Sequence, residues 1–391
     1  MKKLLLASAV SALFTAPAVA LAGTPPAAPT LDKVLEASGL SVTGYMDVGY
    51  TYANKDIENG FSTRVFDSQN NSFALHQFGL TVAKQPKEGF GGLVNVTLGK
   101  DAQGLHSFPE VNAATPPANS TSMFDVTQAY AQYAAGPVTV IAGKFVTLHG
   151  TEVIASPGNA NISRSILFGS VPFTHTGLRA TWAFNDQYAL IFGLNNGYDQ
   201  LTDSNKGKTV ELGGTLNPIK PLTIALSAYS GKENTTLFGA PLAGADGTRT
   251  SINAVASYAI IDPLSVGVEL LQVQQDNMVS TSGTIKGKYS GFAGYVSYTI
   301  IPKLKATLRV ESVTDKDGVK FGLPVDTSDP AASPAKKFTE GTVTVAYLPS
   351  DAFELRGEVR QDQGDNKAFV DSKGQFSKSL MTMALQALYK F

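Results

Sequence analysis

The strongest constraint on this chain is an alternation of apolar and polar side chains with a period of two, which begins at Ser41 and recurs in segments of about ten residues. Across Leu264–Leu270 the apolar residues alternate with Ser, Gly and Glu, and across Phe353–Val359 they alternate with Glu and Arg. Successive side chains of a strand point to opposite faces, so each strand has one face that needs water and one that needs lipid or a core. The pattern predicts an all-β chain.

The connections between these segments also alternate, between short and long. Short turns lie near 86–89, 135–137, 185–187, 217–221, 261–263, 301–303 and 349–352. Long polar stretches lie near 55–71, 101–122, 149–171, 196–207, 231–249, 276–287, 314–337 and 362–377. About sixteen strands with this spacing predict a transmembrane antiparallel β-barrel with short periplasmic turns and long extracellular loops. A closed barrel pairs every backbone group in lipid, and sixteen strands leave a lumen filled with water.

Composition excludes several other classes of protein. Charged residues make up 16% of the chain, whereas an ordinary soluble domain has about 25%. There is no cysteine for a disulfide framework or a thiolate zinc site, and a net charge of -1 does not favour nucleic-acid binding. After the N-terminal leader no apolar run is long enough for a membrane helix. No catalytic set and no phosphate-binding loop is recognisable, so we expect neither an enzyme nor a cofactor.

The N-terminus has the features of a secretory signal peptide. Lys2 and Lys3 precede an apolar run from Leu4 to Phe14, and Ala20-Leu21-Ala22 provides a small-x-small cleavage site. We therefore predict a signal peptide over 1–22, an N-terminal periplasmic segment over 23–40 and a barrel over 41–391. Within 31–40 the sequence allows one short amphipathic helix.

The last alternating segment, Ser379–Phe391, ends in an aromatic residue. This ending resembles the sorting signal of outer-membrane proteins that the barrel assembly machinery binds, so we expect that machinery as a partner during biogenesis. A soluble strand that happens to end in Phe is the alternative. Together with the signal peptide, the ending predicts the outer membrane of a Gram-negative bacterium.

One stretch of the chain is distinctive. It comprises Gly143–Thr147, His149-Gly150, Glu152, Ser163–Ser165 and Phe173–Gly177, and it resembles the OmpL-like beta-barrel porin family of Gram-negative bacteria. The segments 44–52 and 388–391 are also similar to that family. The resemblance implies a porin of undefined substrate in contact with outer-membrane lipid and lipopolysaccharide. By analogy with general porins it also implies a homotrimer.

The long stretch 149–171 follows the fifth strand, and in general porins that connection folds into the lumen and narrows it. By this analogy the candidate constriction residues are His149, Glu152, Arg164 and His175. The Pro-Glu-Phe-Gly-Gly run of general porins is missing, which leaves open a loop packed on the surface with Arg164 paired to Glu152. Two His and Glu152 could also form a metal site, but hydrogen bonds that anchor the loop are the favoured role, and we expect no metal.

The phase of the alternation places a set of charged side chains in the lumen, since such a group facing lipid at the midplane would cost about 2–4 kcal/mol. The set is Asp47, Lys144, Arg179, Glu211, Glu269, Lys305, Arg309, Glu311, Glu354, Arg356, Glu358 and Arg360. Lys144 lies in a strand that is apolar on both faces. The basic members could attract anions, or the clusters near 305–311 and 354–360 could neutralise one another along the wall.

These observations predict passive diffusion of small hydrophilic solutes or ions through a barrel filled with water. A channel specific for one solute, with anions as one candidate class, is the alternative. A structural or adhesive barrel plugged by its loops is a third hypothesis.

Overall fold

A computed structural model describes residues 30–57, 63–67, 69–107, 122–203, 205–237, 240–280, 283–321 and 335–391. The predicted signal peptide over 1–22 and residues 23–29 of the predicted periplasmic segment lie outside these ranges. The chain divides into two units, Met1–Ser38 and Gly39–Phe391. In the first unit, helix α2 spans Leu31–Ser38, and Gly39 follows it with a φ of 66°, a backbone conformation that ends many helices. No helix in the described ranges could cross a membrane.

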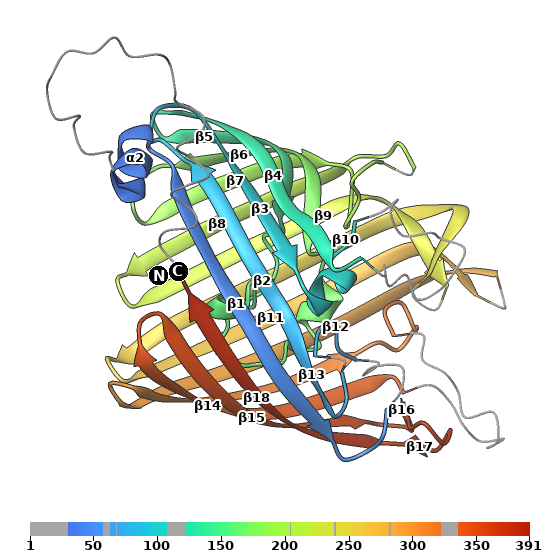
Figure 1. Ribbon diagram of the computed structural model, residues 1–391. Helices are drawn as coiled ribbons and strands as arrows, with labels where there is room; N and C mark the ends of the chain where they lie inside the picture. Colours follow the sequence, from blue (N-terminus) through green and yellow to red (C-terminus); the bar gives the residue numbers. More distant parts are fainter. Residues whose placement is uncertain are drawn as a thin grey trace, which may run out of the picture. The chain divides into compact units, whose positions relative to one another are not determined.

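The second unit is a closed antiparallel barrel in which each strand pairs with its neighbours in sequence (Figure 1). β1 closes the barrel by pairing with β18, and Gly44 and Phe391 exchange backbone hydrogen bonds of 2.8 and 2.9 Å at this seam. The barrel strands are β1 (Ser41–Ala53), β2 (Ser72–Lys84), β3 (Gly89–Leu98), β4 (Phe124–Ala135), β5 (Val138–Val146), β6 (Thr174–Ala183), β7 (Tyr188–Asn195), β8 (Thr209–Ile219), β9 (Leu222–Leu237), β10 (Ala240–Ile261), β11 (Leu264–Ser280), β12 (Gly283–Ile301), β13 (Leu304–Thr314), β14 (Lys337–Ser350), β15 (Phe353–Gly364) and β18 (Ser379–Lys390).

Two further strands and three 3-10 helices lie in the connections. β16 (Phe369–Val370) and β17 (Phe376–Ser377) form a separate two-stranded sheet between β15 and β18. The 3-10 helices are η2 (Lys100–Gly104), η3 (Ser156–Gly158) and η4 (Phe168–Ser170). The sixteen-stranded all-β barrel that the alternation predicts is confirmed.

The two faces of each strand differ in the way that the alternation requires. On β15, Glu354, Arg356 and Glu358 face inward and are 5–8% exposed, whereas Leu355 and Val359 face outward and are 43% and 47% exposed. Outward apolar side chains match a lipid environment, and the charged ones avoid it.

The short turns lie where the sequence predicts them, but two of the predicted long loops are wrong. The stretch 231–249 is mostly strand, because β9 continues to Leu237 and β10 begins at Ala240. The stretch 276–287 is likewise occupied by the ends of β11 and β12. Backbone pairing continues beyond the apolar belt, where the outward face of a strand is polar and exposed, as at Ser230, Gln272 and Ser290. Polar composition therefore marks exposure there and not the end of a strand.

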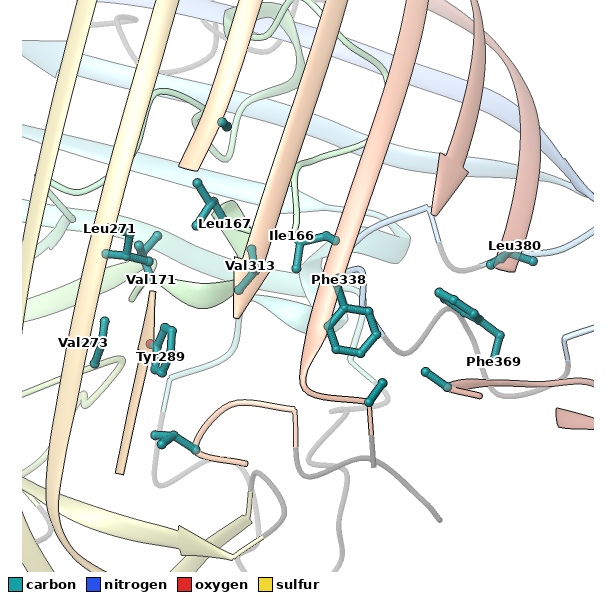
Figure 2. Close-up of a cluster of buried hydrophobic side chains, with 14 of the residues drawn as sticks. Ile166, Leu167, Val171, Leu271, Val273, Tyr289, Val313, Phe338, Phe369 and Leu380 are labelled. Carbon is teal, nitrogen blue, oxygen red and sulfur yellow. The ribbon is translucent and has the colours of Figure 1, made fainter. Parts of the chain in front are cut away.

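An apolar core lies inside the barrel, near the ends of β11–β14 that lead into the long loops (Figure 2). Ile166, Leu167 and Val171, from the connection between β5 and β6, pack there against inward-facing side chains of the wall. The wall contributes Leu271, Val273, Tyr289, Val313, Phe338 and Leu380. A second cluster joins Phe66, Leu105, Ile154 and Phe168. The lumen is thus partly filled by apolar side chains, which the sequence analysis did not predict.

Candidate functional site

The connection between β5 and β6, residues 147–173, runs inside the barrel and is called the inner segment here. It first contacts β9 and β10, where the His149 ring nitrogens Nδ1 and Nε2 lie 2.7 and 2.8 Å from the hydroxyls of Ser227 and Ser251. The backbone N–H of Gly150 then donates to Asn253 Oδ1 at 3.1 Å. We call these neutral contacts the serine anchor.

The inner segment next reaches the wall on β13 and β15. The backbone N–H groups of Ile162 and Ser163 donate to the Glu358 carboxylate at 2.6 and 3.0 Å. Those of Ile166 and Leu167 donate to the Glu311 carboxylate at 2.7 and 3.1 Å. We call these contacts the carboxylate anchor. Each carboxylate holds two consecutive backbone donors, and hydrogen bonds to an ionised acceptor are stronger than neutral ones.

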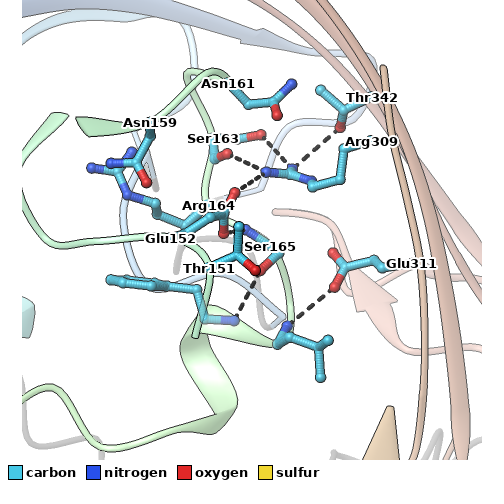
Figure 3. A network of polar contacts seen from close by, with 12 residues as sticks. Thr151, Glu152, Asn159, Asn161, Ser163, Arg164, Ser165, Arg309, Glu311 and Thr342 are labelled. Atoms are coloured by element: carbon cyan, nitrogen blue, oxygen red, sulfur yellow. Dashed lines mark hydrogen bonds and ion pairs between the residues drawn. The ribbon is translucent and has the colours of Figure 1, made fainter. Parts of the chain in front are cut away.

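Arg309 on β13 connects the barrel wall to the inner segment (Figure 3). Its Nη1 donates to Glu152 Oε1 at 2.6 Å and to the Ser163 carbonyl at 2.7 Å, and its Nε donates to Glu340 Oε2 at 3.1 Å. Glu152 Oε2 in turn accepts the backbone N–H of Ser165 at 2.6 Å. The Arg309 side chain therefore binds the inner segment at two places, Glu152 and Ser163.

Arg164 does not pair with Glu152, so that alternative is wrong. Its guanidinium donates to the carbonyls of Val153, Ile154 and Ile162 at 2.8–3.0 Å. It also lies 5.5 Å from the centre of the Phe66 ring, within the range of cation–π attraction. Arg164 thus ties the inner segment to itself.

Two further arginines, both on β15, extend the network. Arg356 Nε donates to Glu354 at 2.8 Å, and Arg360 Nη2 donates to Asp362 at 2.6 Å. Asp362 Oδ2 also accepts from Arg64 Nη2 at 2.7 Å, which brings the connection between β1 and β2 into the network.

Three members of this network, Arg64, Glu340 and Asp362, are absent from the sequence prediction. Asp362 is in phase with Arg360 but lies in a stretch assigned to a loop. Glu340 lies at the polar start of β14. Continuing the alternation of inward-facing positions two residues further along each of these strands would have found Asp362 and Glu340. Arg64 lies in a connection and carries no periodic signal.

The two predicted histidines come together on one side of the inner segment. The rings of His149 and His175 lie 4.6 and 4.5 Å from the Tyr229 ring, and His175 Nδ1 lies 3.0 Å from the Gly197 carbonyl. Burial lowers the pKa of His149 to about 3, so this ring is neutral at ordinary pH. In the described part of the chain no group of His, Asp or Glu is placed to hold a metal ion.

The other predicted residues of the wall lie at separate places. Asp47 accepts from Gln386 Nε2 at 2.9 Å, Arg179 Nη2 donates to Glu211 at 2.7 Å, and Glu269 accepts the Thr151 N–H at 2.9 Å. Lys305 is half-buried on β13.

Lys144 is exceptional among the predicted residues. It is paired in register with Ala129 and Thr176, in phase with Leu178, which faces outward and is 55% exposed. Its ammonium nevertheless turns back onto the Val126 carbonyl at 2.8 Å, and the residue is 7% exposed. Lys144 therefore lies apart from the arginine network.

Together these contacts give a wall whose charges are largely used to hold a segment of backbone. Burying a carboxylate is costly unless it is hydrogen-bonded, and the carboxylates of the anchor accept backbone N–H groups of the inner segment. The arrangement can narrow the barrel and set the charge of the remaining path.

Comparison with solved structures gives outer-membrane channels of the same architecture. The outer membrane channel DcaP of Acinetobacter baumannii superimposes with a TM-score of 0.61 and 15% identity, covering 90% of this chain and 97% of that one. The trimer form of OmpT from Vibrio cholerae gives 0.58 and 11%, covering 90% and 99%. The anion-selective porin from Comamonas acidovorans gives 0.56 and 11%, covering 90% and 99%. At these identities the likeness concerns the fold. No curated protein matches the sequence.

One family model matches nearly the whole barrel unit, over residues 39–391, and confirms the resemblance seen in the sequence. Its outer-membrane setting agrees with the apolar outer face and the buried inner charges described above. The chain belongs to the porin family described as "Putative beta-barrel porin-2, OmpL-like".

Proposed function

We propose that this porin lets small hydrophilic solutes or ions diffuse passively across the outer membrane. The observation that carries the proposal is a closed barrel whose inward side chains are charged and hydrogen-bonded to an inner segment, while its outward side chains are apolar. A lumen lined in this way needs no energy source and no moving part.

The inner segment supports a role as the constriction, with His149, Glu152, Arg164 and His175 setting its position. Apart from Lys144, whose place in the register is on the outward face, the predicted residues of the wall would line the remaining path. Because arginines and carboxylates alternate along β13 and β15, their charges largely cancel. We therefore expect weak ion selectivity.

The setting of the channel is part of the same proposal. We place the short turns in the periplasm and the long connections outside the cell, with residues 1–22 removed as a signal peptide. The C-terminal segment Ser379–Phe391, with its terminal aromatic residue, would carry the signal for the barrel assembly machinery. A homotrimer is supported by the trimer form of OmpT, whose fold is similar.

The test is the single-channel conductance of the folded barrel in a planar bilayer, together with the reversal potential under a salt gradient. Stable open steps with a small reversal potential would support general diffusion. A folded, heat-modifiable barrel that gives no steps would overturn the proposal and leave a plugged structural barrel.

A solute-specific channel is the second candidate. It is favoured by the extent of the contacts of the inner segment, which reach β2, β9, β10, β11, β13 and β15. Open steps that one solute blocks in a saturable way would favour this candidate over general diffusion. Replacing Arg164 with Ala tests an anionic solute, since its positive charge would then be lost.

A further inference from the structure

A small cavity of about 210 Å³ lies inside the barrel, between the inner segment and the wall formed by β1, β2 and β18. The wall supplies Asp47 and Gln386, and the inner segment supplies Ser156 and Ile162. Phe66 and Asp67, from the connection between β1 and β2, also line it. The cavity therefore lies directly beside the segment proposed as the constriction.

Three buried oxygen atoms in this lining accept no hydrogen bond from any described residue. They are Asp47 Oδ1, Asp67 Oδ1 and Gln386 Oε1, and the three residues are 1–5% exposed. Gln386 Nε2 donates to the other oxygen of Asp47 at 2.9 Å, which holds the amide beside the carboxylate. A buried acceptor without a donor is costly, so the cavity favours a ligand that brings several donors.

The charge of the lining favours a cation. Asp47, Asp67 and Asp101 contribute three carboxylates, whereas only two guanidinium groups are near them. One belongs to Arg64, which is paired with Asp67 at 2.6 Å and shared with a further carboxylate of the wall. The other belongs to Arg164, whose N–H groups are directed to carbonyls of the inner segment. One negative charge is left over when the histidine of the lining is neutral.

The other polar groups of the lining can satisfy only part of this demand. His76 Nδ1 lies 3.3 Å from Asp101 Oδ1, which leaves its second ring nitrogen for one of the three oxygens at most. The Ser156 hydroxyl has a single proton to donate. A full set of donors must therefore come from a molecule in the cavity.

We infer that the cavity binds the primary ammonium group of a small solute, either ammonium itself or a short aliphatic amine. An alkylammonium group has three N–H donors and one positive charge, which match the three acceptors and the charge of the lining. Phe66 and Ile162 offer an apolar surface to a short alkyl chain. The inference deepens the solute-specific form of the proposed function and rests on it, since the solute reaches the cavity through the lumen.

The experiment is a calorimetric titration of the full barrel in lipid nanodiscs with ethylammonium chloride at constant ionic strength. Tetramethylammonium chloride is the matched ligand, because it has the same charge but no N–H donor. The parent protein should bind ethylammonium about tenfold more tightly or better, since hydrogen bonds to charged groups are strong. Equal binding of the two salts, or binding of neither, would overturn the inference.

Ammonium chloride distinguishes the two sources of the same chemistry. Tighter binding of ethylammonium than of ammonium would support an aliphatic amine whose chain contacts Phe66 and Ile162. Tighter binding of ammonium would support the free ion as the ligand.

Variants test the place of binding. Asp47→Asn keeps the shape of the side chain but removes its charge, and should weaken ethylammonium binding about tenfold. Asp67→Asn should have the same effect from a different element, which keeps the test decisive if the first variant does not fold. The matched control is Asp125→Asn on β4. Asp125 is 4% exposed and also has an oxygen without a donor, but it does not line this cavity.

The control should bind ethylammonium like the parent protein. Unchanged binding by both Asp47→Asn and Asp67→Asn would overturn the inference, and so would an equal loss in Asp125→Asn.

Conductance keeps this inference separate from the proposed function, because calorimetry needs no current. Ethylammonium binding by a barrel that shows no steps in potassium chloride would overturn diffusion alone. Normal steps with no ethylammonium binding would overturn the ammonium site alone.

Discussion

The inner segment is held at two places by different chemistry. At the serine anchor, His149 meets the neutral hydroxyls of Ser227 and Ser251. At the carboxylate anchor, Glu311 and Glu358 each hold two backbone N–H groups. Arg309, on the same strand as Glu311, is paired with Glu152 and Glu340. A neutral hydrogen bond contributes about 1 kcal/mol net, whereas a buried charge that loses its partner costs several times as much.

The difference teaches that the two anchors respond to change in different ways. The serine anchor can lose one contact and keep the others. Beside the carboxylate anchor, Arg309 holds Glu152, Glu340 and the Ser163 carbonyl at once, so its removal leaves several groups unsatisfied. The side of the pore at β13–β15 is therefore the rigid side.

The largest effect is expected from Arg309→Met. The variant leaves the buried carboxylate of Glu152 without its cation and leaves Glu340 with Arg360 alone, which should lower the free energy of unfolding by about 3–5 kcal/mol. Urea titration of the barrel in lipid vesicles measures this. Lys305→Met, on the same face of β13 but half-buried, is the matched control and should change stability by less than about 0.5 kcal/mol. Equal losses in both variants would contradict a special role for Arg309.

Glu358→Gln should have the next largest effect. The amide keeps the shape but offers a single neutral acceptor to the N–H groups of Ile162 and Ser163, so we expect a loss of about 1–3 kcal/mol. The open-channel current should also become noisier, because the inner segment is less firmly held. Glu354→Gln is the control, since Glu354 contacts Arg356 and no backbone of the inner segment. An open-channel current of Glu358→Gln as quiet as that of the parent would show that the carboxylate anchor does not hold the constriction in place.

The pH dependence tests the serine anchor. The folded pKa of His149 is lowered to about 3, whereas the unfolded value is about 6.5. Between these values only the unfolded chain takes up the proton, so stability falls as pH falls from about 6.5 towards 3, by at most about 1.4 kcal/mol per pH unit. His149→Gln should make the urea midpoint depend less steeply on pH over this window. An unchanged slope would show that His149 does not titrate in this way.

The smallest effect is expected from Ser227→Ala. It removes the hydroxyl at His149 Nδ1 but leaves Ser251 at Nε2, so the loss should be about 1 kcal/mol. The single-channel conductance should stay unchanged. A loss as large as that of Arg309→Met would show that the two anchors do not differ.

The sequence predicted the wall well and the interior poorly, for one physical reason. Alternation along a strand is local, so the faces of β15 and the place of each short turn could be worked out from neighbouring residues. The partners of Arg164 and Glu152 depend on how the inner segment crosses the lumen, and neighbouring residues do not encode that path. The apolar core around Ile166 and Phe338 was missed because inward-facing positions near the long connections were assumed to meet water.

The seam between β1 and β18 also constrains the order in which the barrel can fold. One partner of β1 is β2, which follows it directly in the chain, but its other partner is the last strand of the barrel to be synthesised. A chain that has been made only as far as β15 has two unpaired strand edges, which invite pairing with other chains. Domains that fold during synthesis can begin at their N-terminus, whereas this barrel must stay protected until its last strand is available. Closure of the barrel therefore waits for the last strand of the chain.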